Sequence, residues 1–193
     1  MSKLLNNNFF LIKEHIGLLK AANNYDIYNP ETSEMVMICR EMQLGVLTKI
    51  FRFTKYKIMT PFHVEVMSTR EEPIFSVKRG VSIFGFSPVT VFDQNGLEIG
   101  QLQRKFRLGG AKIDITDMMN NRLFTLKGNL IGWEFKITNE DVELATISKK
   151  WEDWVRNSLR QPTIMCYQLI NKWKRTRLRG ALFLDQYCVW ISF

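Results

Sequence analysis

The sequence of 193 residues has little of what would define several common classes of protein. Its three cysteines, Cys39, Cys166 and Cys188, have no short spacing, which argues against a disulfide framework and a zinc site and fits a reduced, intracellular setting. No run of about 18 apolar residues occurs, so no transmembrane helix is predicted. The N-terminus shows no signal peptide and no myristoylation start, and we expect an intracellular protein, cytoplasmic or peripheral on a membrane.

Residues that carry catalysis or bind metals are also scarce. His15 and His63 are the only histidines, and neither has an acidic residue or cysteine at the spacing of a metal site or a catalytic triad. Gly109 and Gly110 lack the following Lys-Ser/Thr of a phosphate-binding loop. We therefore predict no catalytic residues, no metal site and no enzymatic activity.

Positive charge is in excess, and it is unevenly distributed. The net charge is +8, and residues 152–193 hold seven of the 27 basic but only three of the 19 acidic residues. Within that segment, five of the eight residues 172–179 are basic. Taken literally, such a run predicts binding to anionic lipid or to nucleic acid.

Short apolar runs separated by turns recur along residues 8–151, a pattern that favours an all-β barrel or sandwich. The clearest hairpin joins 89–92 to 97–106 through Asn95-Gly96, a pair that accepts the positive φ angles of a type I′ turn. Many antiparallel strands favour closure of the sheet, because closure removes its edges. Other predicted strands begin or lie at 9–12, 34–39, 62–66, 74–78, 111–116, 122–127, 133–137 and 142–147.

Residues 43–53 break the strand pattern and predict a short amphipathic helix. The apolar residues at helical spacing are Leu44, Leu47, Ile50 and Phe51. The basic residues of this region are Lys49, Arg52, Lys55 and Lys57. Two interpretations stay open: the helix lies on a membrane with its apolar face down and its basic side chains toward lipid phosphates, or it covers the mouth of the barrel with its lysines in solvent.

Several segments occur in the order seen in one known family. They are residues 9–15, 21–28, 47–54, 59–62, 77–80, 128–133 and the run I-S-K-K-W at 147–151. Together they resemble the phospholipid scramblase and LURP-one-related family over roughly residues 8–151. The resemblance implies the tubby C-terminal-like fold, a closed antiparallel β-barrel around a buried apolar C-terminal helix. It also implies phospholipid binding or translocation at the cytoplasmic face of a membrane, without covalent catalysis.

The resemblance stops after Trp151. The family continues with a segment similar to G-x-x-K-E-x-F-T-x-A-D-N-Y, one more strand and the core helix, and this chain has none of these in frame. We therefore predict a barrel domain at 8–151 and an atypical basic tail at 152–193, in which the central helix is missing or replaced. The acidic segment that would bind calcium in responsive scramblases lies near A-D-N, so no cofactor is expected here.

A shift of reading frame accounts for this break. Starting each codon of residues 152–170 one nucleotide earlier permits the reading G-L-G-K-E-F-F-T-S-A-D-N-Y-V-L-S-I-N. The genetic code forces some of these positions, such as the Gly from Trp154-Val155 and the Leu from Cys166-Tyr167, and leaves others to choice. Our hypothesis is that the tail is read out of frame; the alternative is a genuine divergent tail.

Basic residues at strand ends complete the candidate sites. Lys78-Arg79 and Lys149-Lys150-Trp151 combine cations with an interfacial tryptophan, which suits a phospholipid headgroup, although ordinary strand-end charges are the alternative. The predicted lipid-binding residues are Lys49, Arg52, Lys55, Lys57, Lys78, Arg79, Lys149, Lys150 and Trp151. The predicted partner is an anionic phospholipid membrane surface, with no nucleic acid. The alternatives are a cytosolic ligand-binding or regulatory barrel, and a nucleic-acid binder that uses the basic tail.

The reading-frame hypothesis predicts an insertion or deletion in the gene near the codons of residues 150–152. We expect that correcting one slip yields K-E-x-F-T-x-A-D-N-Y and then an apolar helix. The measurement is a nucleotide read from these codons to the stop. An intact frame without any slip would contradict the hypothesis and make the basic tail a genuine part of the protein.

Overall fold

The structure, a computed structural model, describes residues 9–15, 22–42, 45–54, 59–82, 87–106, 110–129, 134–140, 142–150 and 164–169. These residues form twelve β-strands and one α-helix. The helix, α1, spans Val46–Arg52. The strands are β1 (Phe9–Glu14), β2 (Tyr25–Tyr28), β3 (Met35–Glu41), β4 (Phe62–Ser68), β5 (Pro73–Arg79), β6 (Val89–Asp93), β7 (Glu98–Lys105), β8 (Ala111–Thr116), β9 (Arg122–Asn129), β10 (Glu134–Asn139), β11 (Val142–Lys150) and β12 (Ile164–Leu169).

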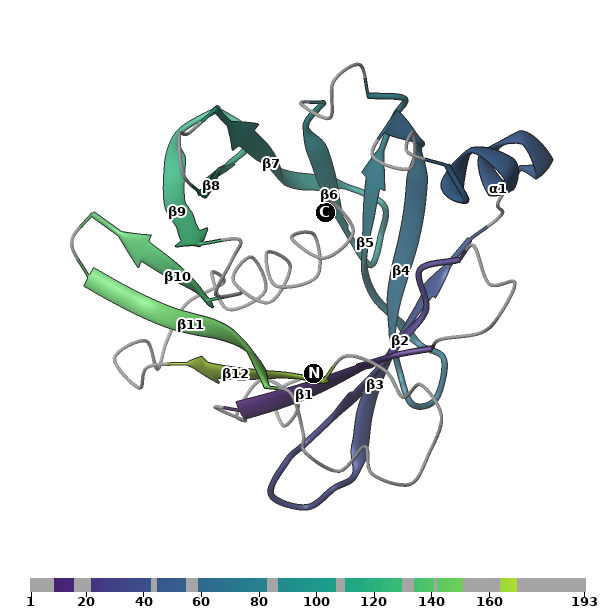
Figure 1. The fold of residues 1–193 in the computed structure, drawn as a ribbon, viewed down its shortest axis with the longest axis horizontal. Helices are drawn as coiled ribbons and strands as arrows, with labels where there is room; N and C mark the ends of the chain where they lie inside the picture. The colour runs from purple at the N-terminus through teal and green to yellow at the C-terminus, as the bar shows by residue number, and fades with distance from the viewer. Residues whose placement is uncertain are drawn as a thin grey trace.

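The strands form one closed antiparallel barrel in which each pairs with its neighbours in sequence (Figure 1). Closure is made by β12, which lies between β11 and β1: Phe10 faces Tyr167, and Lys149 faces Met165. The described strands therefore leave no open edge, since every one has a partner on both sides. This confirms the predicted closed, mainly β barrel.

The closing strand β12 belongs to residues 152–193, the segment predicted to be an atypical tail outside the barrel. The predicted domain at 8–151 leaves out β12, which occupies the place where the family resemblance implies one more strand after residue 151. Without Ile164–Leu169, β1 and β11 would each expose a row of unpaired backbone groups. The predicted loss or replacement of the central helix concerns residues 170–193, which lie outside the described residues.

Alternation along the strands builds the core. In β4, Phe62, Val64 and Val66 are buried, while the intervening His63 and Glu65 are half-buried. This period of two is what a sheet with one buried face requires. The largest fully buried side chains come from β1 to β4 and from β9 to β11: Phe10, Ile27, Met37, Val64, Phe124, Leu126, Phe135, Ile137 and Ile147.

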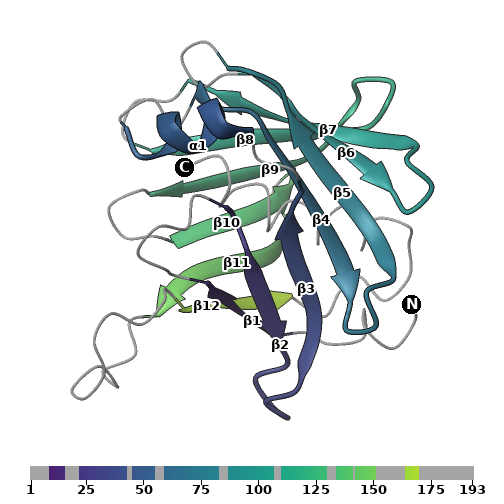
Figure 2. The same ribbon diagram turned by 90° about the vertical axis from the view of Figure 1, so that its right-hand side faces the viewer.

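The meander gives the barrel two different ends (Figure 2). Odd-numbered strands all run in one direction, so the connections that follow β1, β3, β5, β7, β9 and β11 meet at one end. We call this the α1 end, because α1 lies in the connection between β3 and β4. The connections that follow β2, β4, β6, β8 and β10 meet at the other end and are short, and we call this the hairpin end.

Each short connection at the hairpin end contains one residue with a positive φ angle: Ser33, Glu71, Gly96, Asn120 and Glu140. Such a residue lets the chain reverse within a few positions. The hairpin predicted at Asn95-Gly96 is confirmed, but its turn is not type I′, because only Gly96 of that pair has a positive φ. The Asp93 carboxylate accepts hydrogen bonds from the backbone N–H groups of Asn95 and Leu97, which stabilises the turn that forms instead.

Candidate functional site

The helix α1 is the main element at the α1 end that is not part of the sheet. It begins after Gly45, which has no side chain to cap it, and ends at Arg52, with Phe53 as its C-cap. Lys49 and Arg52 lie in its last turn, where positive charge is favourable to the helix dipole. Seven residues are too few to hold a helix in water, so α1 depends on contacts with the barrel.

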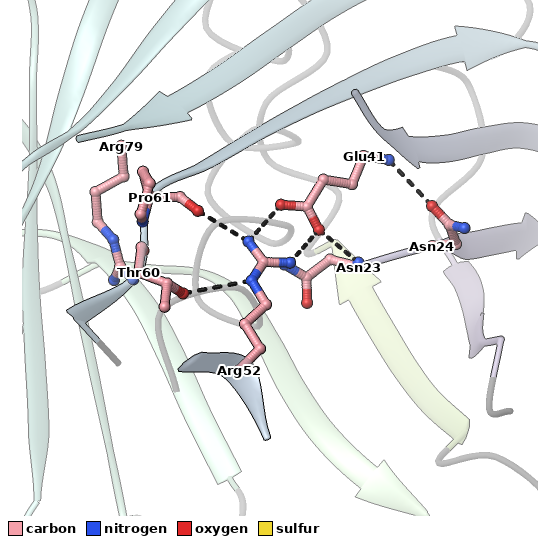
Figure 3. Close-up of polar contacts among 7 residues, drawn as sticks. All are labelled: Asn23, Asn24, Glu41, Arg52, Thr60, Pro61 and Arg79. Carbon is pink, nitrogen blue, oxygen red and sulfur yellow. Dashed lines mark hydrogen bonds and ion pairs between the residues drawn. The ribbon is translucent and has the colours of Figure 1, made fainter. Parts of the chain in front are cut away.

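The central contact is a buried ion pair between Arg52 of α1 and Glu41 at the end of β3 (Figure 3). The two terminal guanidinium nitrogens each meet one of the two carboxylate oxygens, which is the fork geometry of a bidentate pair. The exposed fraction is 3% for the Arg52 side chain and 0% for that of Glu41. Both charges therefore sit inside the barrel mouth, out of reach of solvent.

Neighbouring groups satisfy the remaining hydrogen-bonding capacity of the pair. Arg52 donates from Nη2 to the carbonyl oxygen of Pro61 at 2.9 Å and from Nε to the Thr60 hydroxyl at 3.3 Å. Glu41 accepts from the backbone N–H of Asn23 at 2.7 Å. The pair therefore joins α1 to the connections after β1 and before β4, and it fixes α1 at the mouth of the barrel.

Arg79 is a second buried arginine in the same mouth. It has the same strand phase as Phe75 and Val77, so its side chain points inward. Its Nη2 donates to the carbonyl oxygen of Thr60 at 3.0 Å, and its guanidinium lies 4.7 Å from the centre of the Phe62 ring. The mouth of the barrel is therefore polar, although the strands below it are packed with apolar side chains.

Three apolar side chains at the C-terminal end of α1 are exposed. The exposed fractions are 57% for Ile50, 48% for Phe51 and 61% for Phe53, while Arg52 is 7% exposed. The amphipathic pattern predicted a helix here, and that is confirmed. The helix lies at the mouth of the barrel with Lys49 exposed, as the second interpretation of the sequence has it. Ile50 and Phe51 nevertheless do not pack on the barrel, because Arg52 and its carboxylate partner take the inward position.

The structure separates the predicted lipid-binding residues into groups. Lys49 and Lys78 are exposed, and the ammonium of Lys78 lies 4.9 Å from the centre of the Phe92 ring. Arg52 and Arg79 are buried and bonded inside the mouth, so they are not part of the surface that a headgroup would meet. Lys149 and Lys150 belong to β11 where it reaches the α1 end. Lys55, Lys57 and Trp151 lie outside the described residues.

The α1 end also gathers basic residues that the sequence analysis did not single out. Lys105 ends β7, and Lys112 of β8 is its partner across the ladder. Lys13 and Lys127 occupy comparable positions near the ends of β1 and β9. Nothing in their local sequence identifies them, since only the strand register brings them to one end. The acidic residues Glu14, Asp26 and Glu134 of this end are not fully buried.

The hairpin end has the opposite charge. The acidic residues in or beside its turns are Glu31, Glu34, Glu71, Glu72, Asp93, Glu98, Asp117 and Glu140. The basic residues there are Arg70 and Arg122. The barrel is therefore electrically polar along its axis, basic at the α1 end and acidic at the hairpin end.

A second, less buried charge cluster lies beside the mouth. Asp26 of β2 contacts His15 and accepts a hydrogen bond from Arg40 at 2.8 Å. Burial raises the pKa of Asp26, but the hydrogen bonds from His15 and Arg40 outweigh it and hold the pKa below its ordinary value. For His63, burial and then the charge of Lys78 lower the pKa. Among the described residues, no three His, Cys, Asp or Glu side chains are grouped as a metal site would need.

Geometry thus defines a closed antiparallel barrel whose one end combines a polar mouth, an outward-facing apolar helix and surrounding lysines. The chain belongs to the scramblase family, whose family model matches residues 10–160. That match extends past Trp151, the last residue of the segments that resemble the family.

A solved structure shares the fold. A protein from Arabidopsis thaliana with an X-ray structure aligns with 99% of this chain and 94% of its own length, with a TM-score of 0.57 and 11% sequence identity. At that identity the likeness concerns the fold alone. No curated protein matches this chain. No helix in the described part of the chain has the length and apolar character needed to cross a membrane.

The buried pair predicts a large cost for removing one partner. In Arg52→Leu, the Glu41 carboxylate stays buried without its counter-charge, and we expect the free energy of unfolding to fall by about 3–5 kcal/mol. The control Lys49→Leu changes an exposed lysine of the same helix and should stay within about 0.5 kcal/mol. Urea denaturation measures both. Equal, small losses would show that the pair does not hold α1.

The lowered pKa of Asp26 predicts stability that depends on pH in the acid range. Its carboxylate stabilises the fold above its ordinary pKa of 3.8, and this contribution is lost as the pH falls through the lower pKa of the folded state. We expect Asp26→Asn to be less stable than the wild type at neutral pH, with the difference shrinking below pH 3.8. Urea titrations across this range test it, with exposed Glu31→Gln as control. A difference independent of pH would refute the assignment.

Proposed function

We propose that this scramblase-family barrel binds the anionic phospholipid surface of a membrane through its α1 end, on the cytoplasmic side. The observation that carries the proposal is the opposite charge of the two ends. An anionic surface attracts Lys49, Lys78 and Lys105 and repels the acidic turns at the other end. The barrel would therefore meet a membrane in one orientation.

Family membership supports a phospholipid as the source of the negative charge. The lysines of the α1 end come from α1 and from β1, β5, β7, β8, β9 and β11, so they surround the mouth. Cations spread around a rim suit a flat array of headgroups, and each contributes about 1 kcal/mol near an anionic leaflet. Lipid translocation would add transport to this binding and requires no covalent step.

The buried arginines have a separate role in this proposal. Arg52 and Arg79 organise the mouth from within, and the exposed lysines make the contact with lipid. Because the guanidinium of Arg52 already has a carboxylate partner, it adds no net charge to the surface. The lipid-facing side chains that we propose are therefore Lys49, Lys78 and Lys105. The predicted Lys149 and Lys150 belong to the same set by their position at the end of β11.

The test compares two double variants with the same change in net charge. Lys49→Gln with Lys78→Gln removes two charges at the α1 end, and Arg70→Gln with Arg122→Gln removes two at the hairpin end. In flotation with vesicles of phosphatidylcholine and phosphatidylserine, the first pair should weaken binding about thirtyfold, at about 1 kcal/mol per charge, and the second very little. Vesicles of phosphatidylcholine alone should bind weakly.

Two results would count against the proposal. If the wild-type chain fails to float with phosphatidylserine vesicles, the α1 end does not bind lipid. If both double variants lose the same affinity, binding follows the net charge of the molecule and not the α1 end.

A further inference from the structure

We propose that Ile50, Phe51 and Phe53, which we call the apolar tip, insert between the headgroups and acyl chains of the bilayer when the α1 end binds. This inference rests on the proposed function and goes beyond it. It assigns the contact to three side chains outside the predicted basic set, and it makes apolar insertion part of the binding.

The buried ion pair holds the apolar tip outward. Phe51 and Phe53 flank Arg52 in sequence, so fixing the guanidinium inside the mouth leaves both rings on the solvent side. Figure 3 shows Arg52 reaching from α1 toward Glu41, with Thr60 and Pro61 beside it. The apolar tip is therefore exposed before binding, and no conformational entropy is lost in bringing it to the surface when the membrane binds.

Two backbone carbonyl groups of the apolar tip already have hydrogen-bond partners within the protein. The carbonyl oxygen of Ile50 accepts a hydrogen bond from the N–H of Phe53 at 3.2 Å. The carbonyl oxygen of Phe51 accepts two, from the N–H of Thr54 at 3.0 Å and from the Thr54 hydroxyl at 2.7 Å. Helix ends normally leave such carbonyl groups to water, and unsatisfied groups are costly in lipid. These bonds lower the cost of placing the end of α1 among headgroups.

The basic residues around the apolar tip favour an anionic bilayer as its binding partner. Lys49 lies in the same helix turn, and the surrounding end of the barrel is basic. Apolar side chains beside lysines are typical of helices that lie in the membrane interface. The hairpin end provides the contrast: Met118 and Met119 are 58% and 84% exposed, but they follow Asp117 in the acidic end, where an anionic membrane is repelled.

The experiment compares apolar exposure at the two ends. Phe51→Ser with Phe53→Ser removes the rings of the tip, and Met118→Ser with Met119→Ser is the matched control at the hairpin end. With phosphatidylserine vesicles we expect about hundredfold weaker binding for the first pair, which is about tenfold or 1.4 kcal/mol for each ring, and no change for the second. The difference should persist at high salt, because apolar burial is not screened as the lysine contribution is.

A second measurement locates the side chain. Phe51→Trp and Met119→Trp are compared in vesicles whose acyl chains carry bromine, which quenches nearby tryptophan fluorescence. Relative to the wild-type chain, only Phe51→Trp should gain a quenched component. The unfolding midpoint of each variant is measured alongside, and exposed positions should leave it unchanged.

The outcomes separate the two proposals. If the wild-type chain binds and loss of Lys49 and Lys78 weakens it, but the phenylalanine pair binds as the wild type, the tip stays in water and the inference fails while the proposed function stands. If the wild type does not bind, both fail. If the phenylalanine pair abolishes self-association in sedimentation without vesicles, the tip is an interface between copies and the inference is overturned.

Discussion

The buried pair of Arg52 and Glu41 is the interaction on which the α1 end depends. A seven-residue helix has little stability of its own, and of its side chains that the structure describes, Arg52 is the one that is buried. Burying a guanidinium is costly unless its charge and its N–H groups find partners. Here the Glu41 carboxylate binds it in a bidentate pair, and the oxygen atoms of Thr60 and Pro61 accept two further hydrogen bonds. The same interaction turns Phe51 and Phe53 outward. One ion pair therefore determines both the position of α1 on the barrel and the apolar surface that α1 exposes to solvent.

Sheet topology supplies the rest of the arrangement. In an up-and-down barrel, alternate connections meet at one end, so residues far apart in sequence share a surface without contacting one another. Here that rule gathers Lys13, Lys49, Lys78, Lys105 and Lys127 around one mouth and the acidic turns around the other. The polarity is therefore a property of the register, and it would be lost if a strand slipped or the barrel failed to close.

Much of the barrel could be predicted from the sequence, because buried and exposed residues alternate and turn residues separate the strands. The strand Ile164–Leu169 could not, since it lies in a segment that departs from the family pattern. The helix α1 was predicted from spacing, but its orientation was not, because Glu41 is distant in sequence and nothing local marks it as a partner for Arg52. Arg79 did carry a signal: it shares the phase of Phe75 and Val77. The reading-frame hypothesis stays a prediction.

Hydrogen exchange measured by mass spectrometry shows whether the α1 end faces a membrane. The chain is labelled with and without phosphatidylserine vesicles, and protection is compared between peptides from the two ends. We expect slower exchange at residues 45–54, 80–82 and 105–106 in the presence of vesicles, with no change in the turns at 94–97 and 117–121. Protection confined to the hairpin end, or the same at both ends, would contradict it.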